Sequence, residues 1–369
     1  MKYLDPSKII KNKVVVCVGT RPSFVKMAPV IFKLAEVDAD YKVLHTGQHY
    51  SPDLADIYNE VGLDEADHWI SGLNELTTHG EQIARIMVEA EKYFIEEKPA
   101  LVLVCGDANF NFACGVAARK LRLALGHVES GLRSGDMRTP EEHNRRMLDH
   151  ISDYLFAPTF GTVLNLAREF VPGMIVQTGN TVVDSLNMVY SDVVRTEPPS
   201  NVKYALLTLH REENVDDVAV LKNIIKGLKK VKDALGIPIL YPAHPRTIDR
   251  LKKFNLTKKM NQQVKILPPM PYVKFLAAIM NAQLVLTDSG GVQEEACTLQ
   301  VPSVILRNAT ERPESILVRA SMLAGTEPKN ILKATKAMID SPRDWINPFD
   351  PYGDQNAAER IVNALGLKQ

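Results

Sequence analysis

Short runs of Val, Ile and Leu recur along the chain, separated by longer stretches in which apolar residues follow a helical period. A run that is apolar at every position is typical of a strand covered on both faces of a parallel sheet, because a half-exposed strand would alternate apolar and polar residues. Alternating β and α elements of this kind predict doubly wound α/β sheets. The expected strands are Val14–Val18, Lys42–Thr46, His68–Ile70, Leu101–Cys105, Leu125–Val128, Tyr154–Ala157, Ile175–Gln177, Tyr204–Leu209, Ile239–Pro242, Val264–Leu267, Leu284–Thr287, Ser303–Leu306 and Met322–Ala324.

The number of expected strands exceeds what a single sheet usually holds. A chain of 369 residues is also longer than one hydrophobic core usually supports. We therefore predict two Rossmann-like domains, residues 1–178 and 179–351, that face each other across a cleft. Residues 352–369 are expected to form a C-terminal helix that packs back on the first domain. The polar, proline-bearing segment Arg195–Asn201 is typical of a linker.

The charge balance excludes several classes of partner. Lys plus Arg and Asp plus Glu both number 44, so the net charge is zero and no general field would attract nucleic acid or an acidic membrane surface.

The 4 cysteines form no CxxC pair, a pattern expected of reduced, buried thiols. The first residues are too polar for a signal peptide, and no apolar run reaches the roughly 18 residues of a membrane span. We expect a cytoplasmic protein without a metal or cofactor.

Unusual polar residues follow many of the expected strands. They are Gly19-Thr20-Arg21, Gly47-Gln48-His49, Gly106-Asp107, Glu129, His210-Arg211, His244 and Asp288-Ser289-Gly290-Gly291. In open α/β sheets, ligands bind outside the carboxyl ends of the strands. This distribution predicts an active site in the cleft between the domains.

The turn Ser289-Gly290-Gly291 joins an expected strand to an expected helix. Two glycines would let a diphosphate approach the backbone, where free N–H groups at a helix start attract its charge. Glu295, one turn later, could accept hydrogen bonds from ribose hydroxyls. A plain strand-to-helix turn with Gly for close packing explains the pattern about as well. The Walker pattern is absent, and the GxGxxG pattern is missing after the first expected strand, where Gly19-Thr20-Arg21-Pro22 stands instead. Arg21 and Lys26 flank this first turn and are either an anion clamp or surface charges.

Several acids and a histidine could transfer protons. Asp107 follows an apolar strand, where partial desolvation would raise its pKa toward a useful range. Glu129 stands at another strand end, beside Ser130 and Gly131. Glu141 follows Pro140 at an expected helix start, so it is as readily a helix-terminal acid as a catalyst. His210, next to an arginine, is a better candidate than an isolated histidine.

Taken together, ordered motifs resemble the non-hydrolysing UDP-N-acetylglucosamine 2-epimerases, which have the two-domain GT-B fold. The motifs are GTRP at Gly19–Pro22, TGQH at Thr46–His49, Gly106-Asp107, HVExGLR at His127–Arg133, PEExNR at Pro140–Arg145, TGNTVVD at Thr178–Asp184, HREEN at His210–Asn214, TDSGGVQEE at Thr287–Glu295 and TERPE at Thr310–Glu314. Residues 72–82 resemble archaeal-type members and those acting on diacetamido-uronic sugars.

The resemblance implies interconversion of UDP-N-acetylglucosamine and UDP-N-acetylmannosamine, by elimination of UDP to 2-acetamidoglucal and re-addition with inverted C2, in a homodimer. It implies acid/base roles for Asp107, Glu129 and Glu141, with His210 near the diphosphate and leaving oxygen. The residues it assigns to substrate binding are Arg21, Lys26, Arg145, Phe275, Ser289, Gly290, Gly291, Glu295 and Arg312. Gln48 and His49 lie near the place where bacterial members can bind a second UDP-N-acetylglucosamine as an activator.

Three alternatives stay open at this stage. A 2-epimerase of UDP-2,3-diacetamido-2,3-dideoxyglucuronate would use the same chemistry on another sugar. A glycosyltransferase on the same fold would pass the sugar to an acceptor without exchanging the C2 proton. A non-catalytic UDP-sugar sensor would bind without exchange or turnover.

Overall fold

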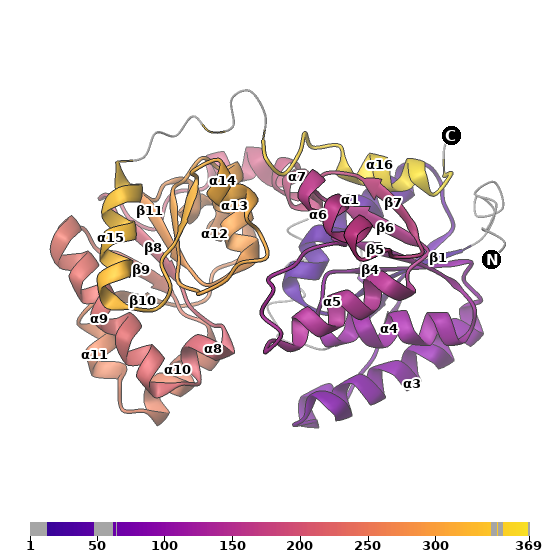
Figure 1. Ribbon diagram of the computed structural model, residues 1–369, viewed down its shortest axis with the longest axis horizontal. Helices are drawn as coiled ribbons and strands as arrows, with labels where there is room; N and C mark the ends of the chain where they lie inside the picture. The colour runs from indigo at the N-terminus through magenta and orange to yellow at the C-terminus, as the bar shows by residue number, and fades with distance from the viewer. Residues whose placement is uncertain (1–12, 48–61, 64, 341–344, 346–349, 368–369) are drawn as a thin grey trace. The chain divides into compact units, whose positions relative to one another are not determined.

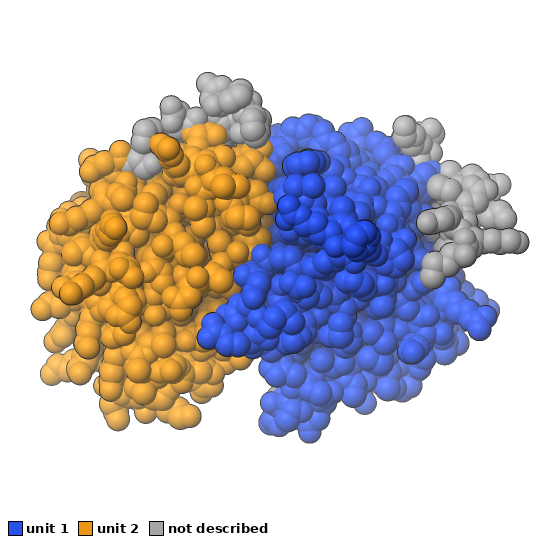
Figure 2. Space-filling model, in the orientation of Figure 1, with its two compact units in different colours: residues 1–189, 352–369 blue, residues 190–351 orange. Residues whose placement is uncertain are grey.

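The computed structural model describes residues 13–47, 62, 63, 65–340, 345 and 350–367. The chain divides into two compact units, which are residues 1–189 with 352–369, and residues 190–351 (Figure 2). Within the described residues, no helix is both long and apolar enough to cross a membrane.

Unit 1 contains a seven-stranded parallel sheet in the order β3-β2-β1-β4-β5-β6-β7. Its strands are β1 (Val14–Val18), β2 (Tyr41–His45), β3 (His68–Trp69), β4 (Leu101–Cys105), β5 (Ala124–Val128), β6 (Tyr154–Ala157) and β7 (Met174–Gln177). Its helices are α1 (Arg21–Glu36), the short 3-10 helix η2 (Leu73–Glu75), α3 (His79–Glu97), α4 (Asn109–Lys120), α5 (Pro140–Ile151), α6 (Phe160–Arg168), most of α7 (Thr181–Arg195) and α16 (Ala357–Ala364). Helices α3, α4 and α5 cover one face of the sheet, and α1 and α16 the other (Figure 1).

Unit 2 contains a six-stranded parallel sheet in the order β10-β9-β8-β11-β12-β13. Its strands are β8 (Ala205–Thr208), β9 (Ile239–Pro242), β10 (Lys265–Leu267), β11 (Leu284–Thr287), β12 (Ser303–Ile305) and β13 (Ser321–Leu323). Its helices are α8 (Glu212–Val215), α9 (Val218–Leu235), α10 (Pro245–Lys253), α11 (Thr257–Asn261), α12 (Tyr272–Met280), α13 (Gly290–Thr298), α14 (Glu314–Leu317) and α15 (Pro328–Ile339).

Both sheets confirm the predicted architecture of two Rossmann-like units. Every expected strand is present, with ends that differ by at most one residue. The strand order reverses between β1 and β4 in one sheet and between β8 and β11 in the other, and such a reversal is where doubly wound sheets bind ligands. Apolar runs specify these strands because all five residues of β1 and of β4 are buried.

Unit 1 extends to Val189, beyond the expected end at residue 178, because the start of α7 is tied to its neighbours. The Ser185 hydroxyl donates to the Val25 carbonyl of α1 at 2.6 Å. The Asp184 carboxylate accepts from the backbone N–H groups of Ala357 and Ala358, at 3.3 and 3.0 Å, and so caps α16. Burial raises the pKa of Asp184 despite these bonds.

Candidate active site

The carboxyl edge of the first sheet gathers predicted site residues. Strands β1, β4 and β5 are neighbours, so Arg21, Asp107 and Glu129, which come after them, lie at one edge. Arg21 begins α1, whose N-terminus is closed by a capping box between Thr20 and Ser23. The edge therefore combines a helix start with two carboxylates.

Glu129 forms an ion pair with Lys26 of α1, and both side chains are almost fully buried. Glu129 has a φ of 68°, in the left-handed region that few side chains other than Asn and Asp adopt. Its Oε2 atom lies 3.1 Å from where a Cβ atom on Gly106 would stand, a tight contact, and the φ of 81° at Gly106 also favours glycine. Local backbone strain of this kind is frequent at functional sites.

Asp107 forms an ion pair with Arg145 of α5. Arg145 is buried and also bonds Glu142 at 2.9 Å, while the Asp107 side chain is 30% exposed. The sequence suggested desolvation as the main influence on Asp107. The structure instead sets it beside a buried guanidinium, which favours the carboxylate form and hence a proton acceptor.

The two glutamates at the start of α5 differ. Glu142 is fully buried and accepts from the Ser134 N–H and hydroxyl, each at 3.0 Å. Burial alone would raise the pKa of Glu142, but these bonds and the charge of Arg145 outweigh it and lower the pKa. Glu141 is half-buried, and its carboxylate has no hydrogen-bond or ion-pair partner within the described part of the chain. Glu141 is therefore the less constrained of the two acids.

Asp288 organises the carboxyl edge of the second sheet, where β8 and β11 are neighbours. Its fully buried carboxylate accepts from the backbone N–H groups of His210 and Arg211, at 3.1 and 2.9 Å, and from Asn214 at 3.1 Å. These bonds fix the segment that carries His210. Sequence reasoning placed Asp288 in the turn but assigned it no role; its position after an apolar strand was the available signal.

The His210 side chain is 38% exposed, with Nδ1 3.5 Å from the Asp288 carboxylate. Its ring centroid lies 5.7 Å from that of His244, which follows β9. Burial of the ring against the unit lowers the pKa of His210; Asp288 opposes this effect and the Arg211 charge reinforces it. The ring is accordingly neutral around neutral pH and can donate one hydrogen bond.

The two glycines that begin α13 have different roles. A Cβ atom on Gly290 would stand 2.7 Å from Glu311 Oε1 and 3.2 Å from Arg312 Cζ, so Gly290 is needed for close packing. A Cβ atom on Gly291 would meet nothing within 4 Å. Ser289 caps the helix by accepting from the Val292 N–H at 3.4 Å. Gly291 therefore leaves open space beside first-turn N–H groups, which have no partner inside a helix.

The other predicted binding residues of unit 2 lie around α13 and α12. Arg312 is buried and pairs with Glu294 at 2.6 Å and Glu311 at 2.9 Å. Glu295 of α13 is buried, and Phe275 of α12 is half-buried. Gln48 and His49, the predicted allosteric residues, lie outside the described residues. Among those described, no three His, Cys, Asp or Glu side chains gather as a metal site would require.

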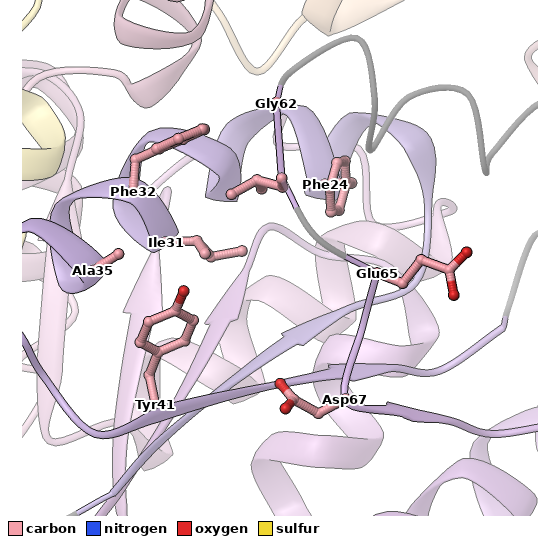
Figure 3. A pocket seen from close by; sticks show the side chains of 9 residues that line it. Phe24, Ile31, Phe32, Ala35, Tyr41, Gly62, Glu65 and Asp67 are labelled. Carbon is pink, nitrogen blue, oxygen red and sulfur yellow. The ribbon is translucent and has the colours of Figure 1, made fainter.

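A pocket of about 300 Å³ in unit 1 is separate from these residues (Figure 3). Phe24, Ile31 and Phe32 of α1 form its apolar wall, opposite Tyr41. Its charged lining consists of Glu65 and Asp67, whose carboxylates would repel a diphosphate. The pocket therefore does not suit the predicted ligand.

Comparison with known proteins decides the family. The sequence model described as UDP-N-acetylglucosamine 2-epimerase matches residues 33–366. A Methanocaldococcus jannaschii protein named UDP-N-acetylglucosamine 2-epimerase is 42% identical, over 96% of this chain and 98% of that protein. The chain belongs to the UDP-N-acetylglucosamine 2-epimerase family.

Structural comparison agrees with this family. The crystal structure of the M. jannaschii UDP-GlcNAc 2-epimerase in complex with UDP-GlcNAc and UDP matches with a TM-score of 0.90 over 96% of this chain and 99% of that chain. The fold is the two-domain GT-B fold, and the chain is an archaeal-type member. Within the family, a Pseudomonas aeruginosa protein named UDP-2,3-diacetamido-2,3-dideoxy-D-glucuronate 2-epimerase is 33% identical over 96% of this chain and 99% of that protein. As an epimerase, the chain is an isomerase.

Proposed function

We propose that the chain interconverts UDP-N-acetylglucosamine and UDP-N-acetylmannosamine. A base removes the C2 proton, the C1–O bond breaks as UDP leaves with its electron pair, and 2-acetamidoglucal remains. UDP then adds back to C1 while an acid protonates C2 on the opposite face. The observation that carries this proposal is the set of carboxylates at one edge of unit 1, two of which are each paired with a buried cation.

Asp107, Glu129 and Glu141 are the proposed acid/base groups. Inversion at C2 needs a proton donor and acceptor on two faces of one carbon, so a single carboxylate is insufficient. Asp107 is paired with Arg145 and Glu129 with Lys26, so a buried cation lies beside each of these two candidate acids. Glu141, which has no ion-pair partner among the described residues, is the third proposed group.

Unit 2 is proposed to bind UDP. The diphosphate would approach the open space at Gly291, where the start of α13 offers N–H groups, and Ser289 and Gly290 would border it. Neutral His210 would donate to the leaving oxygen as the C1–O bond breaks. Glu295 would bind the ribose and Phe275 the uracil, while Arg21 and Arg312 would offset phosphate charge.

Proton NMR of the product tests this proposal. UDP-N-acetylglucosamine incubated with the protein should give UDP-N-acetylmannosamine, recognised by the C2 configuration, until the two epimers reach equilibrium. UDP-2,3-diacetamido-2,3-dideoxyglucuronate, incubated in parallel, should be unchanged. Turnover of the diacetamido sugar alone would overturn the substrate assignment, and turnover of neither would overturn the proposed activity.

A further inference from the structure

The turn that carries Asp107 is held by buried side chains at three consecutive carbonyls. Asn111 donates to the Cys105 carbonyl at 2.6 Å, and its oxygen accepts from the Cys105 N–H at 3.1 Å. His127 Nε2 lies 2.9 Å from the Gly106 carbonyl oxygen. Asn144 donates to the Asp107 carbonyl at 3.0 Å. Each bond restrains one peptide plane, so together they limit how far the Asp107 side chain can shift.

His127 occupies a special position among these three residues because both ring nitrogens face oxygen acceptors. Its Nδ1 lies 2.8 Å from Asp149 Oδ1, and both side chains are fully buried. The other Asp149 oxygen accepts from Arg133 at 2.8 Å and from the Gly131 N–H at 3.1 Å. A carboxylate and a carbonyl can only accept, so the ring satisfies both contacts with a proton on each nitrogen.

Asp149 is held as a carboxylate by its hydrogen-bond partners. Burial by itself would raise the pKa of Asp149, but the hydrogen bond and charge of His127, followed by the charge of Arg133, outweigh burial and lower that pKa. Asp149 is therefore ionised and paired with two cationic groups. The pair orients the imidazolium, much as a carboxylate orients a ligand or catalytic histidine.

Gly106 lies beside both Asp107 and Glu129 in the structure. Gly106 has a φ of 81° and directly precedes Asp107, and its N–H donates to the Val128 carbonyl at 3.0 Å, next to Glu129. We propose that His127, held by Asp149, is a positioning residue that orients the Gly106–Asp107 turn for proton transfer at C2. This inference rests on the proposed function, and the His127 side chain is fully buried.

Two variants at one position separate the two bonds of His127. In His127→Gln the amide can still donate to the Gly106 carbonyl but loses the Asp149 bond; in His127→Asn the amide can still reach Asp149 but not the Gly106 carbonyl. Both variants replace the ring with a neutral amide and keep one of the two bonds, so each serves as the control for the other. A shift of a catalytic group by about 1 Å lowers the reaction rate on the order of a hundredfold.

The expected result is a split between kcat and binding. His127→Asn should lower kcat for C2 epimerisation about a hundredfold with KM and the Kd for UDP within about twofold, while His127→Gln stays within about tenfold of the original kcat. Amide hydrogen exchange at Gly106 and Asp107 should accelerate in His127→Asn whether or not substrate turns over. Equal kcat losses in both variants that follow their losses in Tm, or an unchanged kcat and exchange rate in His127→Asn, would overturn the proposal.

Asp149→Asn serves as a second variant if His127→Asn does not fold. An amide at position 149 no longer stabilises a charged His127 ring. A neutral ring that donates from Nδ1 has no proton on Nε2, so its hydrogen bond to the Gly106 carbonyl is lost. The same kcat loss is expected, and an unchanged kcat would contradict the proposal. An unmodified protein that does not epimerise UDP-N-acetylglucosamine would instead overturn the proposed function, while the amide exchange comparison would still test the positioning role.

Discussion

The two carboxyl edges are built on the same strand order but offer opposite chemistry. In unit 1, the turns after β4 and β5 present Asp107 and Glu129, each neutralised by a buried cation from a helix. In unit 2, the Asp288 carboxylate after β11 accepts from backbone N–H groups, and the start of α13 follows with open space at Gly291. One edge gathers carboxylates suited to proton transfer, and the other gathers N–H donors suited to an anion.

This difference shows that the sheet topology sets only the place of a site. The side chain one or two residues beyond the strand, and the buried partner it meets, set the chemistry. Four sets of variants test whether the two edges differ in this way.

Asp107→Asn tests whether the edge of unit 1 performs proton transfer. The amide keeps the size of the side chain but cannot accept a proton from carbon, so we expect the rate of C2 deuterium exchange to fall by about a thousandfold. The Kd for UDP, measured by calorimetry, should stay within a fewfold because unit 2 supplies the proposed contacts. A large loss of UDP affinity would assign Asp107 to binding and remove the contrast between the edges.

Lys26→Met tests how strongly the cations of unit 1 are coupled to its acids. Removal of one member of a buried ion pair leaves an uncompensated charge, with an expected loss of about 3 kcal/mol in the free energy of unfolding. Lys26→Met combined with Glu129→Gln should recover most of that loss.

As a control, Lys42→Met removes a half-exposed ion pair, in which Lys42 lies 2.7 Å from Asp67, and should cost less than about 1 kcal/mol. Equal losses for the two lysines would contradict the burial of the Lys26 pair. Denaturant titration provides the measurement.

Acid should weaken unit 1 through His45, at the carboxyl end of β2. Burial lowers the pKa of His45 to about 4 from 6.5, and its ring stacks on Trp69 at a centroid distance of 3.8 Å. The unfolded state binds the proton more readily, so stability is intact above about pH 6.5 and falls as the pH drops toward 4. Between pH 7 and pH 5 the loss should be about 2 kcal/mol. Denaturant titrations followed by tryptophan fluorescence should show a shallower pH slope for His45→Gln, and the slope of the original protein for a control at an exposed histidine, His143→Gln.

Gly291→Ala and Gly290→Ala test the edge of unit 2. A methyl group at Gly291 meets no protein atom within 4 Å, so the Tm should hold while a diphosphate loses its close approach and UDP affinity falls about tenfold. A methyl group at Gly290 would collide with Glu311, so both the Tm and the affinity should fall. Unchanged UDP affinity in Gly291→Ala would place the diphosphate elsewhere.

The fold could be predicted from the sequence because strands buried on both faces of a sheet are apolar at every position. The strands Val14–Val18 and Leu101–Cys105 are apolar at every position, and their ends in the structure match the expected ones. The end of unit 1 could not be predicted in the same way. It depends on the contacts of Asp184 and Ser185 with α16 and α1, and no local pattern reports contacts between such distant segments.

The site was predicted only in part, for a similar reason. A polar residue at a strand end is visible in the sequence, so Asp107, Glu129 and His210 could be named. Their buried partners, such as the Arg145 beside Asp107, follow from packing between elements. His127 is a polar residue inside a buried strand, which was a signal, but its pairing with Asp149 of α5 could not be read from spacing.

If the acids of unit 1 exchange the proton of the carbon that they invert, epimerisation in heavy water must place deuterium at C2. The reaction is run in heavy water with UDP-N-acetylglucosamine, and the recovered sugar nucleotides are analysed by proton NMR and mass spectrometry. The account predicts one deuterium at C2 of every molecule of UDP-N-acetylmannosamine formed. Product that retains the original C2 hydrogen, or sugar transferred to an acceptor with no exchange, would contradict it.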